Sequence, residues 1–434
     1  MNTNILAVVG NPILHSLSPV LINAACENKN LDYRYLRLHA NTALEAITSF
    51  KMLNLKGMNV TAPFKQDIIQ YLDNLTENAK KANAVNCVFI KNNQLWGDNT
   101  DITGVELSIK QYPDFLKDGK MLVIGSGGAT PAVIIAGQNL NLDVTVAARN
   151  IEVLNQLKLK FNVKTIPLTE LPNCVNNFKI IVQALPSGVK VFDPTILKSG
   201  RLILDANYKD SIFEKLSNTI GYKFLSGKNW LVNQAVPAFN RFTEENTSAD
   251  IMYKALEKYN FKYQKRIALV GFMGVGKTTS GKILAEKFGY KFIDLDDEIE
   301  LQEGMKISEI FNKKGEDYFR DIEQKKLSEY SNMQNIILSC GGGTVKNKSN
   351  QKLLNNNFLT IWLYATSKYC IEGLDVSNRP LLQCENKAEK AEKMLQERIP
   401  YYANSAYSVL NVENLHSQQI AEKIYEQINR TFGI

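Results

Sequence analysis

Short apolar runs alternate with stretches of helical periodicity along almost the whole chain. The apolar runs end in turn-forming residues and predict strands at residues 5–10, 33–38, 58–60, 84–90, 121–124, 143–147, 180–184 and 202–205, and again at 266–271, 290–294, 335–339 and 359–364. The stretches between them predict helices at residues 19–29, 42–53, 129–140, 151–159 and 248–259. Strands that alternate with helices in this way indicate an α/β protein with mostly parallel sheets.

Length and composition fit several globular domains. The chain has 434 residues, 44% of them hydrophobic and 22% charged, and a domain takes about 150 residues as a first estimate, so we expect three domains. The net charge of +7 comes from basic residues scattered along the chain. A scattered excess favours small anionic ligands over nucleic acid. The sequence does not indicate an oligomeric state.

Cysteine usage and the apolar runs favour the cytoplasm. Six cysteines form no CxxC pair, and three dispersed histidines do not suggest a zinc site. No apolar run approaches the ~18 residues of a membrane span, and the first residues lack a basic segment followed by an apolar one. We therefore expect a cytoplasmic protein with no membrane partner.

Residues 271–278 read GFMGVGKT and match the phosphate-binding pattern GxxxxGK[ST] between a strand and a helix. In such a loop, backbone N–H groups and the helix N-terminus face the phosphates, the lysine reaches the β- and γ-phosphates, and the hydroxyl that follows binds Mg²⁺. The residues expected to bind ATP are Gly271, Gly274, Gly276, Lys277, Thr278 and Thr279.

Charged residues recur downstream of this loop. Asp294 and Asp296 share a face if the strand continues through them, so one could bind the metal and the other a substrate hydroxyl; the alternative is an acidic helix cap. Arg320 and Glu323 are three residues apart, which also fits an ordinary surface ion pair. The strand at 335–339 is followed by three glycines at 341–343, where something approaches the backbone closely.

The ordered set GFMGVGKT, FIDLDDEIE, GEDYFRDIE, GGG, RPLL and RIPYY resembles the shikimate kinase family over residues 265–434. The resemblance implies a P-loop α/β domain that phosphorylates shikimate to shikimate 3-phosphate with ATP and Mg²⁺. It implies that Asp294 and Thr278 bind Mg²⁺, that Asp296 orients the attacking hydroxyl, and that Arg379, from a lid over about residues 366–381, stabilises the transferring phosphoryl group. The residues implied to hold shikimate are Asp296, Arg320, Gly341, Gly342, Gly343 and Arg398.

One position departs from this family. Glu372 stands where the family often has a second lid arginine near the adenine. The departure concerns the nucleotide contacts of the lid and leaves the class of reaction unchanged.

Polar residues also gather at strand ends in the first half. Ser18 followed by Pro19 is typical of a helix N-cap, which does not account for Ser16 in the same segment, GNPILHSLSP. Thr61 and Lys65 share the turn NVTAPFK. Two further polar segments are ANAVN at 82–86 and GDNTD at 97–101. Taken one at a time, these segments also fit solvated turns.

Residues 125–129, GSGGA, follow a strand and open a helix, where a dinucleotide pyrophosphate binds in many α/β proteins. The glycine spacing departs from GxGxxG, so the motif alone is weak. The next strand ends before Arg149 and carries no acidic residue at its tip, which favours NADP over NAD unless Arg149 is simply a surface residue. The expected NADP contacts are Gly125, Gly127, Gly128, Ala129 and Arg149.

These segments, with DANY at 205–208 and LVNQAVPAFNRFT at 231–243, resemble shikimate dehydrogenase over residues 1–259. The resemblance implies two lobes: a substrate-binding lobe of residues 1–104 and 235–260, and a Rossmann-like NADP lobe of residues 105–234. It implies that Ser16, Ser18, Thr61, Asn86, Asp101, Tyr208 and Gln234 bind the substrate. Val153 stands where a second arginine is common, so we expect a weaker preference for NADP.

By the same resemblance, Lys65 and Asp101 form the catalytic pair of a reductase that converts 3-dehydroshikimate to shikimate with NADPH. Hydride transfer to a ketone creates an alkoxide, which a lysine ammonium stabilises and protonates while the carboxylate orients it. Reduction produces the hydroxyl that the kinase then phosphorylates, so the two assignments support each other. Two alternatives stay open: a quinate-preferring dehydrogenase fused to a kinase, and a pathway sensor built from inactive enzyme domains.

Overall fold

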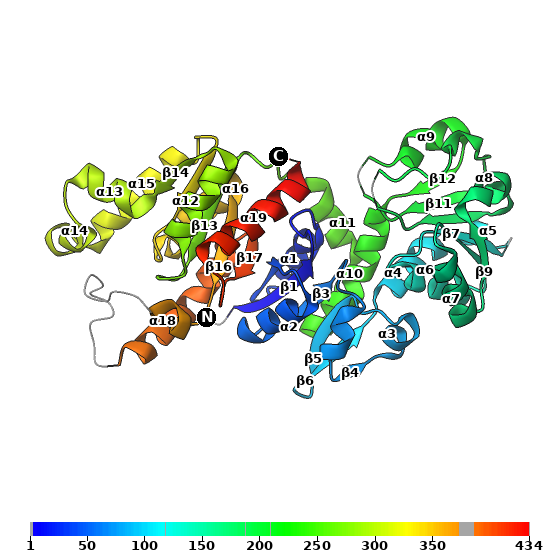
Figure 1. Ribbon diagram of the computed structural model, residues 1–434, viewed down its shortest axis with the longest axis horizontal. Coiled ribbons are helices and arrows are strands. Elements are labelled where there is room, and N and C mark those ends of the chain that lie inside the picture. The colour runs from blue at the N-terminus through cyan, green and yellow to red at the C-terminus, as the bar shows by residue number, and fades with distance from the viewer. Residues whose placement is uncertain (1–2, 118, 187, 209, 373–385, 434) are drawn as a thin grey trace. The chain divides into compact units, whose positions relative to one another are not determined.

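The computed structural model describes residues 3–117, 119–186, 188–208, 210–372 and 386–433 (Figure 1). Contacts divide the chain into two compact units. Unit 1 comprises Met1–Pro19, Asn30–Lys56 and Tyr259–Ile434; unit 2 comprises Val20–Lys29 and Gly57–Lys258. Each unit is described by itself below.

Unit 1 is built on a parallel sheet that joins the first two strands of the chain to the last five. The strand order is β14-β15-β13-β16-β17-β2-β1, and each neighbouring pair is parallel. The strands are β1 (Asn4–Gly10), β2 (Tyr33–His39), β13 (Arg266–Gly271), β14 (Lys291–Asp294), β15 (Ile336–Ser339), β16 (Leu359–Tyr364) and β17 (Ser408–Asn411). Every residue of β13 and β16 is buried, which explains their continuous apolar sequences.

The helices of unit 1 are α2 (Ala43–Met52), α12 (Lys277–Phe288), α13 (Leu295–Glu303), α14 (Ile307–Lys314), α15 (Glu316–Tyr330), α16 (Lys348–Asn357), α17 (Ser367–Ile371), α18 (Lys387–Ser405) and α19 (Ser417–Phe432), with the short 3₁₀ helix η5 (Thr344–Lys346). Several begin at a polar cap; Thr42, for example, accepts a hydrogen bond from the Glu45 N–H at the start of α2. Helices α12 and α19 pack together (Figure 1).

Part of unit 2 is a small sheet of order β3-β5-β6-β4, formed by β3 (Gly57–Val60), β5 (Cys87–Lys91), β6 (Gln94–Asp98) and β4 (Asn74–Leu75). β5 pairs antiparallel with both β3 and β6. The turn between β5 and β6 holds Asn92 and Asn93 at φ of 51° and 58°, which suits a two-residue hairpin. The helices in this part of the chain are η1 (Asp67–Tyr71), α1 (Ser18–Asn28), α3 (Glu77–Ala82), α4 (Asp101–Lys110), α10 (Gly227–Thr243) and α11 (Ala249–Lys258), of which α3 and α10 contact the sheet.

The rest of unit 2 is a parallel sheet of order β9-β8-β7-β10-β11-β12. Numbered along the chain this is 3-2-1-4-5-6, the Rossmann order, whose ligand site lies where the order reverses, between its first and fourth strands. The strands are β7 (Lys120–Ile124), β8 (Asp143–Ala148), β9 (Lys164–Pro167), β10 (Ile180–Gln183), β11 (Leu202–Asp205) and β12 (Lys223–Leu225).

Helices cover both faces of this sheet (Figure 1). Met121 and Val123 of β7 pack in the core shared with α4, α6 (Thr130–Asn139) and α7 (Ile151–Phe161). Leu122 and Ile124 point to the other core, which contains Phe213 of α9 (Ile212–Ile220). The remaining short helices are α5 (Pro113–Leu116), η2 (Leu168–Glu170), α8 (Leu171–Cys174), η3 (Val175–Asn177) and η4 (Pro194–Ile196).

The α/β class predicted from the sequence is confirmed, and the predicted strands are present with shifted ends. The run at 84–90 becomes a strand only from Cys87, because Asn83, at a positive φ, ends helix α3 and residues 84–86 lead from it into the strand. Strands β4, β6, β9, β12 and β17 were not predicted. No helix among the described residues is both long and apolar enough to cross a membrane.

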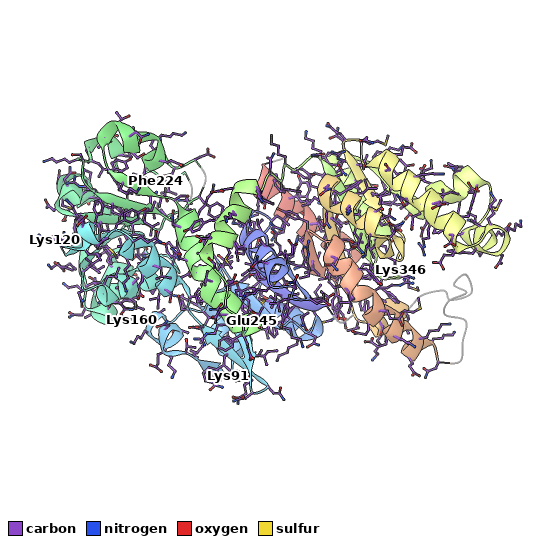
Figure 2. The ribbon with its side chains drawn as sticks, turned by 180° about the vertical axis from the view of Figure 1, so that it is seen from behind. Lys91, Lys120, Lys160, Phe224, Glu245 and Lys346 are labelled. Carbon is purple, nitrogen blue, oxygen red and sulfur yellow. The ribbon has the colours of Figure 1, made fainter. Side chains whose placement is uncertain are left out.

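Exposed lysines lie on separate elements, as the scattered pattern of the sequence predicts. Lys91, Lys120, Lys160 and Lys346 belong to β5, β7, α7 and η5 and are exposed (Figure 2).

Candidate active sites

The phosphate-binding loop of unit 1 connects β13 to α12. Gly271, Gly274 and Gly276 all have positive φ, and a Cβ on Gly271 would lie 2.4 Å from the carbonyl oxygen of Leu363. The Lys277 ammonium donates hydrogen bonds to the carbonyls of Gly271 and Phe272 at 3.0 and 2.9 Å, so it lies inside the curve of the loop. This backbone conformation requires glycine and leaves a cradle for phosphates.

The metal ligands expected from the sequence lie beside this loop. The Thr278 hydroxyl donates to Asp294 Oδ2 at 2.7 Å and lies 3.4 Å from the Ser339 hydroxyl at the end of β15. Within the described residues no cluster of three or more His, Cys, Asp or Glu side chains is arranged to hold a metal. One hydroxyl and one carboxylate nevertheless fit Mg²⁺, which takes oxygen ligands and is usually shared with phosphates and water.

The expectation that Asp294 and Asp296 share a strand face is wrong, and the alternative, an acidic helix cap, is confirmed. The strand ends at Asp294, and Asp296 lies in α13, so the two carboxylates do not share a strand face. Asp294 caps α13 by accepting a hydrogen bond from the Asp296 N–H at 3.1 Å and meets Thr278 with its other oxygen. The same carboxylate therefore caps the helix and lies beside the hydroxyl with which it is expected to share a metal. Burial, with Asp294 and Glu300, raises the pKa of the neighbouring Asp297.

Three predicted substrate residues converge on the three glycines that follow β15. A Cβ on Gly341 would lie 2.6 Å from Asp296 Oδ1, and one on Gly343 would lie 2.7 Å from Arg320 Nη2. Arg398 Nη1 lies 3.2 Å from the Cβ position of Gly342 and donates to the carbonyl of that glycine at 3.3 Å. One carboxylate and two guanidiniums thus surround a single turn.

Arg320 is held by two carboxylates, and its pair with Glu323 is not an ordinary surface ion pair because Glu323 is buried. Its Nη1 donates to Glu323 at 2.9 Å, and Glu323 is 1% exposed and also accepts a hydrogen bond from the Thr344 hydroxyl at 2.6 Å. Burial lowers the pKa of Arg320, but Glu323 and Glu316 raise it more, so the net shift is upward. The fixed guanidinium can present its remaining N–H groups to an anion. The sequence pairs Glu323 with Arg320, but Glu323 was not predicted as a site residue.

The remaining candidates for this site are Tyr402, which was not predicted, and Thr279 and Arg379, which were expected to act on ATP. Tyr402, in the RIPYY segment, donates to the Gly342 carbonyl at 2.7 Å, and burial raises its pKa to about 12. Thr279 is exposed in the first turn of α12. Glu372 follows α17, whereas Arg379 and most of the expected lid lie outside the described residues.

In unit 2, the predicted catalytic pair is formed. Lys65 Nζ donates to Asp101 Oδ2 at 2.7 Å, and the two side chains are 14% and 10% exposed. Trp230 Nε1 of α10 donates to the other oxygen, Asp101 Oδ1, at 3.1 Å. Both oxygens of the carboxylate are therefore held, which fixes the position of the ammonium. Trp230 was not predicted.

Buried polar side chains adjoin the pair. Asn86 accepts a hydrogen bond from the Thr100 N–H at 2.7 Å and donates to the Thr100 hydroxyl at 3.0 Å. Gln234 lies 3.4 Å from the Asn86 amide and 3.2 Å from the Thr100 hydroxyl. All three are buried. Thr100 was missed, although it lies in the GDNTD segment.

The nucleotide loop of unit 2 lies beside this network. A Cβ on Gly128 would lie 4.0 Å from Lys65, so the loop and the predicted catalytic lysine are neighbours. Gly125 has a φ of 125°, and a Cβ there would lie 2.8 Å from the Ala184 carbonyl. Helix α6 has Ala129 as its N-cap residue and no side-chain cap, so its first N–H groups suit a pyrophosphate at the point where the strand order reverses. These residues fit a dinucleotide.

The other predicted residues are dispersed over the elements. Arg149 is exposed after β8, and the next residue, Asn150, caps α7. Thr61 and Tyr208 are half-buried in unit 2. Ser16 and Ser18 are buried and belong to unit 1; the Ser18 N–H donates to the Ser16 hydroxyl at 3.3 Å.

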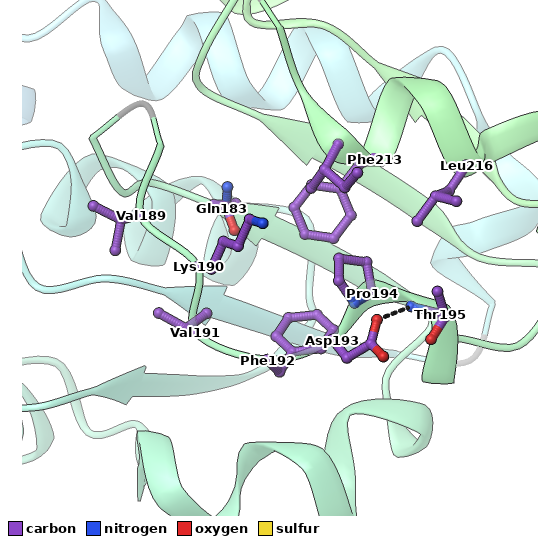
Figure 3. A pocket seen from close by; sticks show the side chains of 11 residues that line it. Gln183, Val189, Lys190, Val191, Phe192, Asp193, Pro194, Thr195, Phe213 and Leu216 are labelled. Carbon is purple, nitrogen blue, oxygen red and sulfur yellow. Dashed lines mark hydrogen bonds between the residues drawn. The ribbon is translucent and has the colours of Figure 1, made fainter.

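A separate hollow of about 460 Å³ opens in the Rossmann-like part (Figure 3). It lies between the end of β10, the segment after it and α9 (Figure 3). Its lining consists of Gln183, Val189, Lys190, Val191, Phe192, Asp193, Pro194, Thr195, Ile212, Phe213 and Leu216. Among the described residues that line it, none was predicted as a site residue.

Taken together, a Rossmann sheet beside a lysine–aspartate pair and a P-loop beside a carboxylate–guanidinium cluster define a nucleotide-dependent dehydrogenase joined to a kinase. Family models match in the same order: the shikimate dehydrogenase substrate-binding domain at residues 8–88, shikimate/quinate 5-dehydrogenase at 106–201 and shikimate kinase at 273–429. The chain belongs to the shikimate dehydrogenase family in its N-terminal part and to the shikimate kinase family in its C-terminal part.

Individual relatives agree with this division. The NADP⁺ shikimate dehydrogenase of Methanosphaera stadtmanae is 33% identical over 276 residues, which cover 59% of this chain and 97% of the relative. The shikimate kinase of Thermodesulfovibrio yellowstonii is 40% identical over 167 residues, which cover 38% of this chain and 96% of the relative.

Solved structures extend the likeness to the fold. The crystal structure of shikimate dehydrogenase from Aquifex aeolicus is 30% identical, with a TM-score of 0.56 over 59% of this chain and 98% of that one. A chorismate mutase/shikimate 5-dehydrogenase fusion protein from Clostridium acetobutylicum is 25% identical, with a TM-score of 0.53 over 59% of this chain and 97% of that one.

Proposed function

We propose that this protein reduces 3-dehydroshikimate to shikimate with NADPH and phosphorylates shikimate with ATP to shikimate 3-phosphate. The observation that carries the proposal is that two separate groups of reactive side chains, each beside a nucleotide-binding loop, lie among the described residues of one chain. Lys65 meets Asp101 at 2.7 Å beside a nucleotide loop, and Asp296, Arg320 and Arg398 surround one turn beside a P-loop. A sensor built from inactive enzyme domains has no need of these groups.

In the reductase, Lys65 stabilises the developing alkoxide and donates a proton to it. Asp101, held by Trp230, keeps the ammonium in place. NADPH, when bound, supplies the hydride; Gly125, Gly127, Gly128 and Ala129 are proposed to hold its phosphates, with Arg149 at the ribose 2′-phosphate. The residues proposed to bind the substrate are Ser16, Ser18, Thr61, Asn86, Tyr208 and Gln234.

In the kinase, Arg320 and Arg398 suit the shikimate carboxylate, because guanidinium matches carboxylate geometry. Asp296 is proposed to orient the attacking hydroxyl, and Lys277 to contact the phosphates. Mg²⁺, held through Thr278 and Asp294 when bound, neutralises phosphate charge. Arg379 is proposed to stabilise the transferring phosphoryl group.

We also propose the division into functional domains expected from the sequence: residues 1–104 with 235–260 for the substrate, 105–234 for NADP, and 265–434 for the kinase. A cytoplasmic location is proposed as well. The described cysteines are free thiols, which suits a reducing compartment.

The decisive experiment incubates the purified chain with 3-dehydroshikimate, NADPH and MgATP and detects shikimate 3-phosphate by mass.

Lys65→Ala should abolish NADPH oxidation and leave ATP turnover with added shikimate intact, whereas Lys277→Ala should do the reverse. Loss of both activities from either single change would contradict two separate sites. A higher kcat/KM for quinate than for shikimate would overturn the choice of substrate.

A further inference from the structure

The segment of residues 11–17, between β1 and α1, is the part of unit 1 that carries Ser16. We call it the substrate loop, since the proposed function assigns the hydroxyls of Ser16 and Ser18 to substrate binding. Its backbone has a hydrogen bond of its own, from the Ser16 N–H to the Ile13 carbonyl at 3.0 Å. Other backbone groups of the loop are bound by side chains from elsewhere in unit 1.

Gln427 of α19 holds the start of the loop. Its Oε1 accepts a hydrogen bond from the Ile13 N–H at 2.9 Å, and its Nε2 donates to Asn11 Oδ1 at 3.0 Å. Gln427 is 3% exposed and Ile13 is fully buried. A buried N–H that lost this partner would lack a substitute, so the contact determines where the backbone of the loop can lie.

Tyr407, the residue before β17, holds the end of the loop in two ways. Its hydroxyl donates to the Leu14 carbonyl at 3.0 Å. Its carbonyl accepts from Arg37 Nη1 at 3.2 Å, and its ring lies under the Arg37 guanidinium at 3.8 Å. Arg37, 4% exposed, donates in turn to the Ser16 carbonyl through Nε and Nη2 at 3.0 and 2.7 Å.

These contacts cross from the kinase sequence to the dehydrogenase sequence. Tyr407 and Gln427 lie within the segment matched by the shikimate kinase model, and the loop lies within the segment matched by the dehydrogenase substrate-binding model. Strands β17 and β2 pair in register, with Ser408 opposite Arg37, which keeps Tyr407 beside Arg37.

We infer that Tyr407 and Gln427 of the kinase part are positioning residues for the dehydrogenase reaction, acting through the backbone that carries Ser16. The inference rests on the proposed function of the dehydrogenase part. Displacement of a substrate-binding group by a fraction of an ångström weakens binding strongly. Loss of either contact should therefore raise the KM for shikimate, while the turnover set by Lys65 and Asp101 persists.

The test compares Gln427→Met and Tyr407→Phe with the wild-type full chain. Gln427→Met removes both amide contacts at similar volume; Tyr407→Phe removes one hydroxyl and keeps the ring on Arg37. NADP⁺-linked oxidation of shikimate is measured without ATP, and kinase constants are measured separately. We expect the dehydrogenase KM for shikimate to rise about tenfold in Gln427→Met and about threefold in Tyr407→Phe, with kcat and the KM for NADP⁺ within twofold. Kinase constants should not change.

Gln418→Met is the matched control, since Gln418 is exposed on the same helix, and all its constants should equal those of the wild type. An unchanged KM for shikimate in both variants would overturn the inference. So would a parallel loss of both activities, which marks a purely structural role. If Gln427→Met does not fold, Tyr407→Phe decides alone. Absence of shikimate oxidation in the wild type would overturn the proposed function, and the inference with it.

Discussion

At the scale of single residues, the glycines after β15 show how a missing side chain makes a site. Gly343 has a φ of −105°, which alanine adopts freely, so its backbone does not require glycine. What requires it is Arg320, whose guanidinium lies where a Cβ would be.

Gly343→Ala should therefore displace Arg320 without strain in the turn. We expect the kinase KM for shikimate to rise about ten- to a hundredfold, while the KM for ATP and both dehydrogenase constants stay unchanged. Steady-state kinetics of each activity check this. A rise in the KM for ATP alone would show that Arg320 does not serve the acid substrate.

Trp230 offers a second test at this scale. Trp230→Phe removes the donor to Asp101 Oδ1, so the carboxylate and Lys65 gain freedom. The dehydrogenase kcat should fall about tenfold, as expected for a lost hydrogen bond to a charged group worth roughly 1.4 kcal/mol, with an unchanged KM for NADP⁺.

The matched control is Trp96→Phe, because Trp96 Nε1 is buried without a hydrogen-bond partner among the described residues. Equal losses in the two variants would mean that Trp230 contributes only its ring.

The sequence predicts the charged residues of both proposed sites but not the groups that hold them. Lys65, Asp101, Asp296 and Arg320 stand in motifs, and their chemistry can be inferred from residue type and spacing. Trp230 lies 129 residues from Asp101, and it resembles any aromatic residue of an apolar helix face. Such partners depend on how α4 packs against α10, which a linear pattern does not contain.

At the scale of elements, the continuously apolar strands could be predicted from the sequence, whereas short strands and helices rich in polar residues could not. Runs such as residues 266–271 and 359–364 are continuously apolar because both faces are buried. The short strand β17 has no such signal, and helix α10 contains Pro237 and many polar residues that hide its periodicity. The β5–β6 hairpin was missed although Asn92 and Asn93 mark its turn.

The start of α7 gives a prediction at this scale. Asn150 accepts a hydrogen bond from the Val153 N–H at 3.1 Å and caps the helix. Asn150→Ala should lower the free energy of unfolding by about 1 kcal/mol, as measured by urea denaturation. Asn150→Ser keeps a capping oxygen and should remain near the wild type; equal losses in both variants would argue against the cap.

At the scale of the whole molecule, His39 links stability to pH. Its ring lies 3.0 Å from the Ser408 hydroxyl between β2 and β17, and burial, with Lys423, lowers its pKa from 6.5 to about 3. Between these values the unfolded chain binds a proton that the folded chain does not. The contribution of His39 to the free energy of unfolding is therefore fully present above pH 6.5 and is lost progressively as the pH falls toward 3.

The contribution lost at pH 5.5 is about 1.4 kcal/mol. In His39→Gln, the difference in unfolding free energy between pH 7.5 and pH 5.5 should be smaller than in the wild type by this amount. This holds however much the substitution itself lowers the unfolding free energy at pH 7.5. Urea denaturation at both pH values measures the difference. The same difference in wild type and variant would mean that His39 does not titrate on unfolding.

The pairing of β17 with β2 has a consequence for expressing the two enzymes separately. β2 pairs with β1 on one side and β17 on the other, so the backbone groups with which β2 and β17 face each other are paired in the joined chain. A cut within residues 260–265, followed by separation of the pieces, would expose a row of unpaired N–H and C=O groups on each. Such edges recruit other strands. Separately produced halves should therefore aggregate more readily than the joined chain, and co-expression should restore their solubility.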